Sequence, residues 1–428
     1  MKINLRNLIL RNINRRDKQE ECDKKKQIIE RLSMDKDTGF NIRKNEWIKK
    51  YQEIRKQYRE IRVHRLWSTR IGEYIVRYLT IVEDSKKNAE KGILDVFILS
   101  DCMNHNARLS TIMGRNIHII DKTNIDMWKY ILYRFPKVAF SKYWNTYANK
   151  KKDRRFDAES TVQYFRLTQE EEQEGQYKKE AMGLKGPFVC VSSRDATYLE
   201  KILPEIDCHY HDFRDSDINK FSSSADYLSK QGITAVRMGR YVKNSVEFDN
   251  CIDYANEYYD ELLDIVLAKD CKFYIGDSSG IVWLPMVLNR PIALRNWIPV
   301  FLDSETLPYN SHNLMIFKKY YKKGENRFLS IKEMMEIEKK VKYNGNLYVQ
   351  YGIEVIENSA EEILDLVMEM NARIDGKWIE TVEDIKLQEK YQRIYKEWFM
   401  KQHYKESTML RMKVGTLFLR KNAFLLDE

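Results

Sequence analysis

Residues 270–299 read DCKFYIGDSSGIVWLPMVLNRPIALRNWIP, and this stretch decides the predicted fold. The apolar run at 272–275 predicts a buried strand, and residues 281–288 have the spacing of a helix. Residues 291–294 predict the next strand, which is followed by a loop at 296–299. A strand, a tight loop, a helix and another strand form the repeating unit of a parallel sheet with crossover helices.

The same alternation fills most of the chain, whose 428 residues suffice for two or three domains. Further strands are predicted at 61–67, 94–99, 117–120, 187–192 and 234–238. The predicted fold class is therefore α/β, with two Rossmann-like domains facing each other across a cleft. The predicted organisation is a basic helical extension (1–58), a first Rossmann-like domain (59–182), a second one (183–330) and a helical C-terminal region (331–428) that braces both and has one candidate strand at 347–349.

The net charge of +10 is concentrated at the beginning of the chain, because residues 1–60 contain 18 Lys and Arg but only 10 Asp and Glu. A basic extension favours a polyanionic partner, either nucleic acid or an anionic membrane surface. No nucleic-acid-binding module is recognisable, so nucleic acid is the less favoured partner of residues 1–58. No run of about 20 apolar residues is present, and the six cysteines form no CxxC pair. We therefore expect a cytoplasmic protein, with peripheral contact to the inner face of the cell membrane as a further expectation.

The carboxyl ends of the predicted strands indicate where a ligand would bind, because open parallel sheets bind ligands beyond these ends. In the first half this rule selects the turn at 69–73, in which Arg70 and Glu73 are the charged residues. In the second half, guanidinium groups that can pair with phosphate are expected from Arg194 and Arg237, and Arg214 can reach the same edge. The residues selected in the second half are Arg194, Asp195, Arg214, Arg237, Gly239, Asp277, Ser278, Ser279, Gly280 and Asn296.

The loop at 276–280 (GDSSG) is the most informative of these positions. Its two glycines allow tight backbone turns, and its two serines supply hydroxyl groups. The loop leads directly into a predicted helix, whose free N–H groups attract anions. The sequence therefore favours a site for phosphate or sugar groups, although Asp277 or Ser278 could also serve only as a helix cap.

Two other features have more than one interpretation. Residues 209–217 (HYHDFRDSD) are either a metal site, in which Asp215 and Asp217 form a DxD triplet, or a loop before a helix capped by Asp217. Glu73 is either a general base for an acceptor hydroxyl or a first-turn glutamate favoured by the helix dipole. No Walker loop, GxGxxG, HExxH or Ser/His/Asp order occurs, which argues against kinases, dehydrogenases and hydrolases.

Taken in order, several of these motifs resemble a family of bacterial glycosyltransferases associated with surface-glycan synthesis. The resemblance covers about residues 60–300 and depends on the ordered series and on no single motif. Where the family pattern has a histidine after the Arg-Ile-Gly turn, this chain has Glu73, so the identity of the base stays open. The shared motifs are Arg70 to Gly72, Arg194-Asp195, Arg237 to Gly239, Asp253-Tyr254, Cys271 to Gly276, Ser279-Gly280 and Asn296 to Pro299.

The resemblance implies a GT-B fold and transfer of a sugar from a nucleotide sugar to a glycan, lipid-linked or protein acceptor. Residues 59–182 would present the acceptor, with Glu73 and Arg70 as catalytic candidates, and residues 183–330 would hold the donor. The nucleotide sugar is a substrate, and neither a cofactor nor a metal is expected. Two alternatives remain: a metal-dependent GT-A-like transferase that uses Asp215 and Asp217, and a non-catalytic protein that binds nucleotides or glycans.

Overall fold

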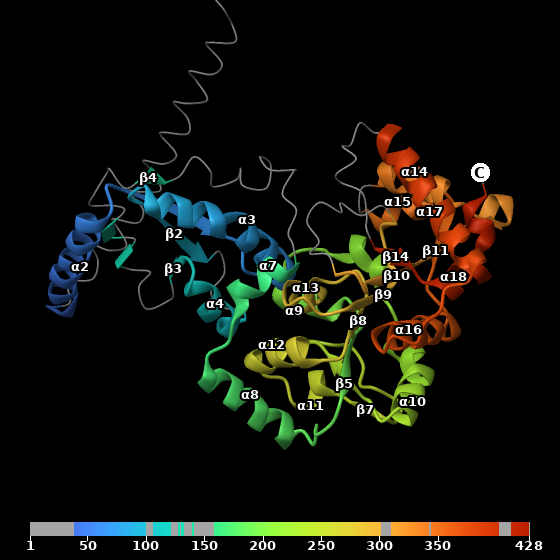
Figure 1. The fold of residues 1–428 in the computed structure, drawn as a ribbon. Helices are drawn as coiled ribbons and strands as arrows, with labels where there is room; N and C mark the ends of the chain where they lie inside the picture. The colour runs from blue at the N-terminus through green and yellow to red at the C-terminus, as the bar shows by residue number, and fades with distance from the viewer. Residues whose placement is uncertain are drawn as a thin grey trace, which may run out of the picture. The chain divides into compact units, whose positions relative to one another are not determined.

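The computed structural model describes residues 38–99, 106–120, 127–128, 130–131, 139–140, 158–300, 310–341, 344–401 and 412–427 (Figure 1). The chain forms two compact units. The first takes its described residues from Met1–Leu66, Ile81–Cys102 and Asn116–Tyr147. The second takes them from Trp67–Thr80, Met103–Arg115 and Ala148–Glu428.

The first unit contains a four-stranded parallel sheet with the order β3-β2-β1-β4. Its core consists of alternate residues of the strands, such as Ile61 and Val63, together with Trp128. The helix α2 (Thr38–Gln57) precedes the sheet, and α3 (Ile71–Glu90) follows its first strand. The strands predicted at 61–67, 94–99 and 117–120 are confirmed; the sheet consists of β1 (Glu60–Leu66), β2 (Ile93–Leu99), β3 (His118–Ile120) and β4 (Ala139–Phe140).

The second unit is built on a seven-stranded parallel sheet with the order β14-β10-β9-β8-β5-β6-β7. From β5 the chain first adds β6 and β7 on one side, and then returns to place β8, β9 and β10 on the other. The order of the strands therefore reverses between β5 and β8, which makes this pair a topological switch point. The strands are β5 (Phe188–Ser192), β6 (Thr234–Met238), β7 (Cys251–Ile252), β8 (Tyr274–Gly276), β9 (Ile292–Trp297), β10 (Leu314–Phe317) and β14 (Lys413–Val414).

Helices of the second unit cover this sheet, and α12 packs beside α8 and α4 (Figure 1). The Lys178 ammonium of α8 contacts Asp260 at 2.6 Å, and Asn106 before α4 donates to the Glu261 carbonyl at 2.9 Å. These bonds explain why α4 and α8, both within the predicted first domain, belong to the second unit. The helices before β9 are α4 (Ala107–Gly114), α7 (Ala158–Val162), α8 (Gln169–Ala181), α9 (Thr197–Ile202), α10 (Ser222–Lys230), α11 (Tyr254–Glu257), α12 (Glu261–Asp270) and α13 (Trp283–Val287), with the 3-10 helices η1 (Gln163–Phe165), η2 (His209–Arg214), η3 (Ile218–Phe221) and η4 (Gly280–Val282).

The C-terminal part is mainly helical, as predicted, but it also contains a small antiparallel sheet with the order β12-β11-β13. The prediction of a candidate strand at 347–349 is wrong, because these residues lie in a helix whose first turn is capped by Asn344. Its Tyr348 is buried while the adjacent Val349 is 78% exposed. The elements are β11 (Lys319–Lys322), η5 (Lys323–Glu325), β12 (Arg327–Phe328), α14 (Ile331–Val341), α15 (Gly345–Gln350), β13 (Ile353–Ile356), α16 (Ala360–Ile374), α17 (Val382–Lys401), α18 (Thr416–Lys421) and η7 (Ala423–Leu426).

The sheets and helices confirm the α/β class and the parallel strands. The two facing domains and their predicted boundaries stay predictions. The candidate membrane-binding helix at the start of the chain lies outside the described residues. Among the helices that are described, none has the length and apolar character needed to cross a membrane.

Candidate functional site

The site begins at the switch point, where the loops that follow β5 and β8 meet. The backbone N–H of Arg194 donates to Asp277 Oδ2 at 2.5 Å, and the Ser216 hydroxyl donates to the same oxygen. The Asp277 side chain is fully buried, and its Oδ1 has no hydrogen-bond partner among the described residues. Asp277 therefore connects three loops, which is a larger structural role than the helix cap considered from the sequence.

The next residue, Ser278, joins the same loop to the end of β9. Its hydroxyl accepts from the Ile298 N–H at 2.9 Å and donates to the Ile298 carbonyl at 2.6 Å. Asn296 was predicted in the loop after this strand, but it lies within β9. It is fully buried, has a positive φ of 50°, and exchanges two 2.6 Å hydrogen bonds with Asn358. Both predicted donor residues thus hold the backbone around the site.

The turn at the beginning of α3 packs directly against the start of η4. A Cβ atom on Gly72 would lie 2.8 Å from Gly280 Cα, and one on Gly280 would lie 3.1 Å from the Gly72 nitrogen. Only two glycines allow backbones to approach this closely. The turn is also held by Tyr198 of α9, whose hydroxyl donates to the Thr69 carbonyl at 3.1 Å. The structure therefore brings two stretches together that the sequence analysis selected separately.

This packing gathers three arginines from three segments, Arg70 before α3, Arg194 after β5 and Arg214 at the end of η2. Arg214 donates to the Ser278 carbonyl, and Arg194 pairs with Asp215. We call these three residues the arginine cluster. Arg70 is partly exposed.

His211 belongs to the same region; the sequence analysis considered it only as part of the possible metal site at 209–217. Burial lowers the pKa of His211, and the positive charges of Arg214, Arg194 and Arg70 lower it further, to about 4. All three guanidiniums therefore act on one ring, which agrees with the contacts that gather the arginine cluster.

Two buried cations that the sequence analysis did not identify support the 213–217 loop. Lys318 donates to the Phe213 carbonyl at 3.1 Å and to the Asp215 carbonyl at 2.5 Å. Burial lowers the pKa of Lys318 to about 8. Arg295 in β9 is fully buried and donates to the Ser193 hydroxyl and, at 3.4 Å, to the Asp217 carbonyl. Both residues lie in or after apolar strands, and only the folded sheet places their charges beneath the loop.

Arg237 lies apart from these contacts, in a buried ion pair. Its guanidinium is 1% exposed and contacts Asp253 at 3.0 Å. Contact with a diphosphate would require this pair to open, so the donor-binding role of Arg237 stays a prediction. Gly239, two residues further on, has a φ of +153°, and a Cβ atom there would lie 2.8 Å from Val242.

Two further candidates also have local partners. Asp195 accepts from the Thr197 N–H at 2.9 Å and from the Lys243 N–H at 3.0 Å, so it shapes the loop before α9. The Glu73 carboxylate is 40% exposed and pairs with Arg77, one turn along α3, at 2.7 Å. Glu73 is therefore accessible, and its role as a base stays a prediction.

In the segment 215–217, the structure agrees with the interpretation of a loop before a helix capped by Asp217. Asp217 caps η3 by accepting from the Asn219 N–H at 2.9 Å. Asp215 is paired with Arg194. In the described ranges, no group of three or more His, Cys, Asp or Glu side chains is placed to hold a metal ion.

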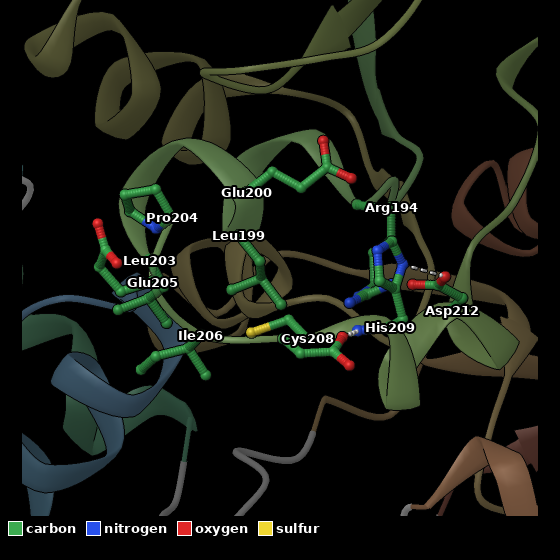
Figure 2. Close-up of a pocket in the computed structure, with 12 residues that line it drawn as sticks. Arg194, Leu199, Glu200, Leu203, Pro204, Glu205, Ile206, Cys208, His209 and Asp212 are labelled. Atoms are coloured by element: carbon green, nitrogen blue, oxygen red, sulfur yellow. Dashed lines mark hydrogen bonds and ion pairs between the residues drawn. The ribbon is translucent and has the colours of Figure 1, made fainter.

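A pocket of about 360 Å³ adjoins the arginine cluster, because Arg194 forms part of its wall (Figure 2). Figure 2 shows side chains of α9, of the following loop and of η2 around this space. The lining combines an apolar surface, including Leu199 and Leu203, with carboxylates such as Glu200 and Asp207. Such a lining suits a ligand that has both an apolar face and hydrogen-bonding groups.

Comparison with known proteins gives similarity at the level of solved structures. No family model matches the chain, and no curated protein matches it. It is similar to the glycosyl transferase family 9 structure from Veillonella parvula DSM 2008, with 13% identity, a TM-score of 0.41, and coverage of 74% of this chain and 97% of that one. It is also similar to the E. coli ADP-heptose lps heptosyltransferase II, with 11% identity, a TM-score of 0.36, and coverage of 55% and 84%. The S. aureus MnaA-UDP co-structure is similar at 11% identity and a TM-score of 0.29, with coverage of 75% and 98%. Similarity this weak does not establish an activity, which the geometry of the site itself has to support.

Proposed function

We propose that the protein is a bacterial glycosyltransferase that moves a sugar from a nucleotide sugar to an acceptor in surface-glycan synthesis. One observation carries this proposal: the arginine cluster converges at the switch point of the larger sheet. Guanidinium groups bind phosphate oxygens through paired, charge-assisted hydrogen bonds. The first N–H groups of α3 add a partial positive charge beside Arg70. The site therefore suits the diphosphate of a nucleotide sugar.

The proposed reaction breaks the bond between the anomeric carbon and the diphosphate oxygen, while an acceptor hydroxyl oxygen bonds to that carbon. The nucleoside diphosphate leaves with the bonding electron pair, and the acceptor proton passes to a base. Cations preorganised around the leaving oxygen stabilise this developing charge. In this scheme Arg70, Arg194 and Arg214 provide the charge, and Glu73 is the proposed base at the start of α3.

Other predicted donor residues keep supporting roles in the proposal. Asp277, Ser278 and Asn296 hold the loop that carries Ser279 and Gly280, and Asp195 holds the loop after Arg194. The pocket beside Arg194 is the proposed place for the sugar or the acceptor. The acceptor is a glycan, a lipid-linked glycan or a protein, and the basic residues 1–58 would approach an anionic membrane surface.

Donor binding is tested by isothermal titration of the full chain with ADP-, UDP-, GDP-, CMP- and dTDP-sugars. We expect one donor class to bind, and Arg70→Gln to weaken it by about tenfold or more, since a hydrogen bond to a charged group contributes about 1.5–3 kcal/mol. The matched control is Arg393→Gln, because Arg393 is an exposed arginine of α17. Equal affinity in both variants would contradict the assignment of the arginine cluster.

Transfer is tested separately, by product formation with and without EDTA. We expect activity to persist in EDTA, because the guanidiniums and not a metal neutralise the leaving group in this proposal. Loss of activity in EDTA would favour the metal-dependent alternative with Asp215 and Asp217. Binding without transfer or donor hydrolysis would favour the non-catalytic alternative.

A further inference from the structure

His211 is a buried titratable group that the proposed reaction does not yet use. The residue lies on η2 and is 8% exposed, with its ring packed against Tyr210 at a centroid distance of 4.0 Å. Its Nδ1 is enclosed and has no hydrogen-bond partner among the described residues. An enclosed polar atom without a partner is costly, so its presence beside a charged cluster requires an explanation.

The charges that act on this ring are positive and come from three separate segments. Arg70 lies before α3, Arg194 lies after β5, and Arg214 lies on the same turn as His211. The two nearby carboxylates are already engaged, because Asp212 contacts His209 at 2.9 Å and Asp215 pairs with Arg194.

Among the described residues, the other elements that pack on this turn add no opposing charge to the ring. Lys318, between β10 and β11, donates to two backbone carbonyls of the turn. On α15, Gly345 lies against Phe213, and the Tyr348 ring packs at a tilt against the Phe213 ring, with the centroids 5.2 Å apart. The described surroundings of His211 therefore hold the imidazole neutral near pH 7 while the arginine cluster has no anion.

An anion on the arginine cluster reverses this balance. A diphosphate brings two or more negative charges to the guanidiniums that disfavour imidazolium. The anion then offsets the neighbouring cations that oppose protonation, because the ring gains an ionic partner, while burial continues to oppose it. A protonated imidazole also has two N–H donors, and one of them could bond to a phosphate oxygen.

We propose that His211 is a fourth ligand of the anion site, which takes up one proton from solvent as the diphosphate binds and donates it in a hydrogen bond to a phosphate oxygen. This inference rests on the proposed function and deepens it, because it identifies a binding residue at the leaving-group end of the donor. When the nucleoside diphosphate dissociates, the proton returns to solvent. Anion affinity must therefore rise as the pH falls through the pKa of the bound form.

The test measures the ring directly, by NMR of the full chain labelled with ¹³C at the histidine Cε1 positions. The probe is inorganic sulfate, which stays doubly charged from about pH 5 to about pH 8, with chloride at equal ionic strength as the reference. His211→Gln identifies the signal. We expect no titration of this signal above about pH 5 in chloride, and a rise of its midpoint by at least about one unit in sulfate.

The affinity for sulfate is measured in parallel by titration of the thermal midpoint. If the bound ring regains its ordinary pKa of 6.5, sulfate binds roughly fourfold more tightly at about pH 6 than at about pH 8. His211→Gln should abolish this pH dependence. The matched control is His209→Gln, because His209 is exposed on the same turn and pairs with Asp212.

Two results would overturn the inference in distinguishable ways. If sulfate stabilises the protein but the His211 signal does not move, the imidazole is not a ligand, and the proposed function is unaffected. If sulfate and nucleotide sugars both fail to bind at any pH, the anion site itself is wrong, and the proposed function fails with it.

Discussion

Replacing Arg237 with alanine should destabilise the protein before it affects donor binding. The Arg237 guanidinium donates to Asp253 Oδ1 at 3.0 Å, and both side chains are at least nine-tenths buried. Removing the cation leaves a buried carboxylate without its charge partner, which costs about 3–5 kcal/mol. Asp253 also accepts from the Val246 N–H at 3.0 Å and from Asn256 Nδ2 at 2.8 Å. These remaining bonds favour the lower end of the range.

The loss is large compared with a total stability of about 5–15 kcal/mol. With an m-value near the upper limit of about 3 kcal/mol per molar urea, the unfolding midpoint should fall by roughly 1 M. Urea denaturation of the full chain, followed by fluorescence, measures this shift. Arg166→Ala is the matched control, because Arg166 is exposed, and its midpoint should not change.

A second variant separates charge from packing. In Arg237→Met with Asp253→Asn, neither member of this buried pair is charged, so the double variant should be more stable than Arg237→Ala. The folded fraction of each variant should bind the nucleotide sugar with wild-type affinity. An unchanged midpoint together with lost donor binding would refute this reasoning, and would show that Arg237 contacts the diphosphate, as the sequence predicted.

Three further expectations follow from the site and from its surroundings. Gly72→Ala places a Cβ atom 2.8 Å from the Gly280 backbone, so it should weaken donor binding and lower stability by about 1–3 kcal/mol. The control is Gly114→Ala, whose Cβ atom meets nothing within 4 Å and should leave binding unchanged. Equal donor binding in the two variants would contradict the role of the contact between Gly72 and Gly280. Glu73→Gln should lower transfer by about a hundredfold or more and leave donor affinity unchanged in titration; wild-type turnover would show that Glu73 is only a first-turn residue of its helix. Burial raises the pKa of Asp264 from 3.8 to about 7, so the folded state keeps this proton to a higher pH than the unfolded state does. The free energy of unfolding should therefore fall by on the order of 4 kcal/mol as the pH rises from about 4 to about 7. Denaturation at a series of pH values tests this slope, which should flatten in Asp264→Asn; an equal slope in both proteins would assign it to another group.

Much of the second unit could be predicted from local pattern. The runs at 187–192 and 234–238 are short, apolar and rich in β-branched residues, and both form strands of the larger sheet. The cap at Asp217, one of the two interpretations of residues 209–217, followed from its position before a helical stretch and is confirmed. Periodicity and capping depend on neighbouring residues in the sequence, so the elements that they indicate can be predicted without knowledge of the fold.

The local pattern failed where the decisive partner is distant in the chain. Residues 347–349 are apolar enough for a strand, yet they lie in a helix whose Tyr348 is buried against Phe213 and Tyr320. Asn296 was expected in a loop, but its bonds to Asn358 place it within β9. In both cases the contact that decides the backbone comes from tertiary packing.

The segment 270–299 shows the same division within the candidate site. By itself the sequence determined a strand, a glycine-flanked loop, a helix and a second strand, because each depends on residue spacing. Only the tertiary structure decided that β5 lies beside β8, that Gly72 meets Gly280, and that Arg237 is enclosed with Asp253. The physical reason is that the charge of a side chain follows from its residue type alone. Its ion-pair partner and its exposure depend on which strands and loops fold against it.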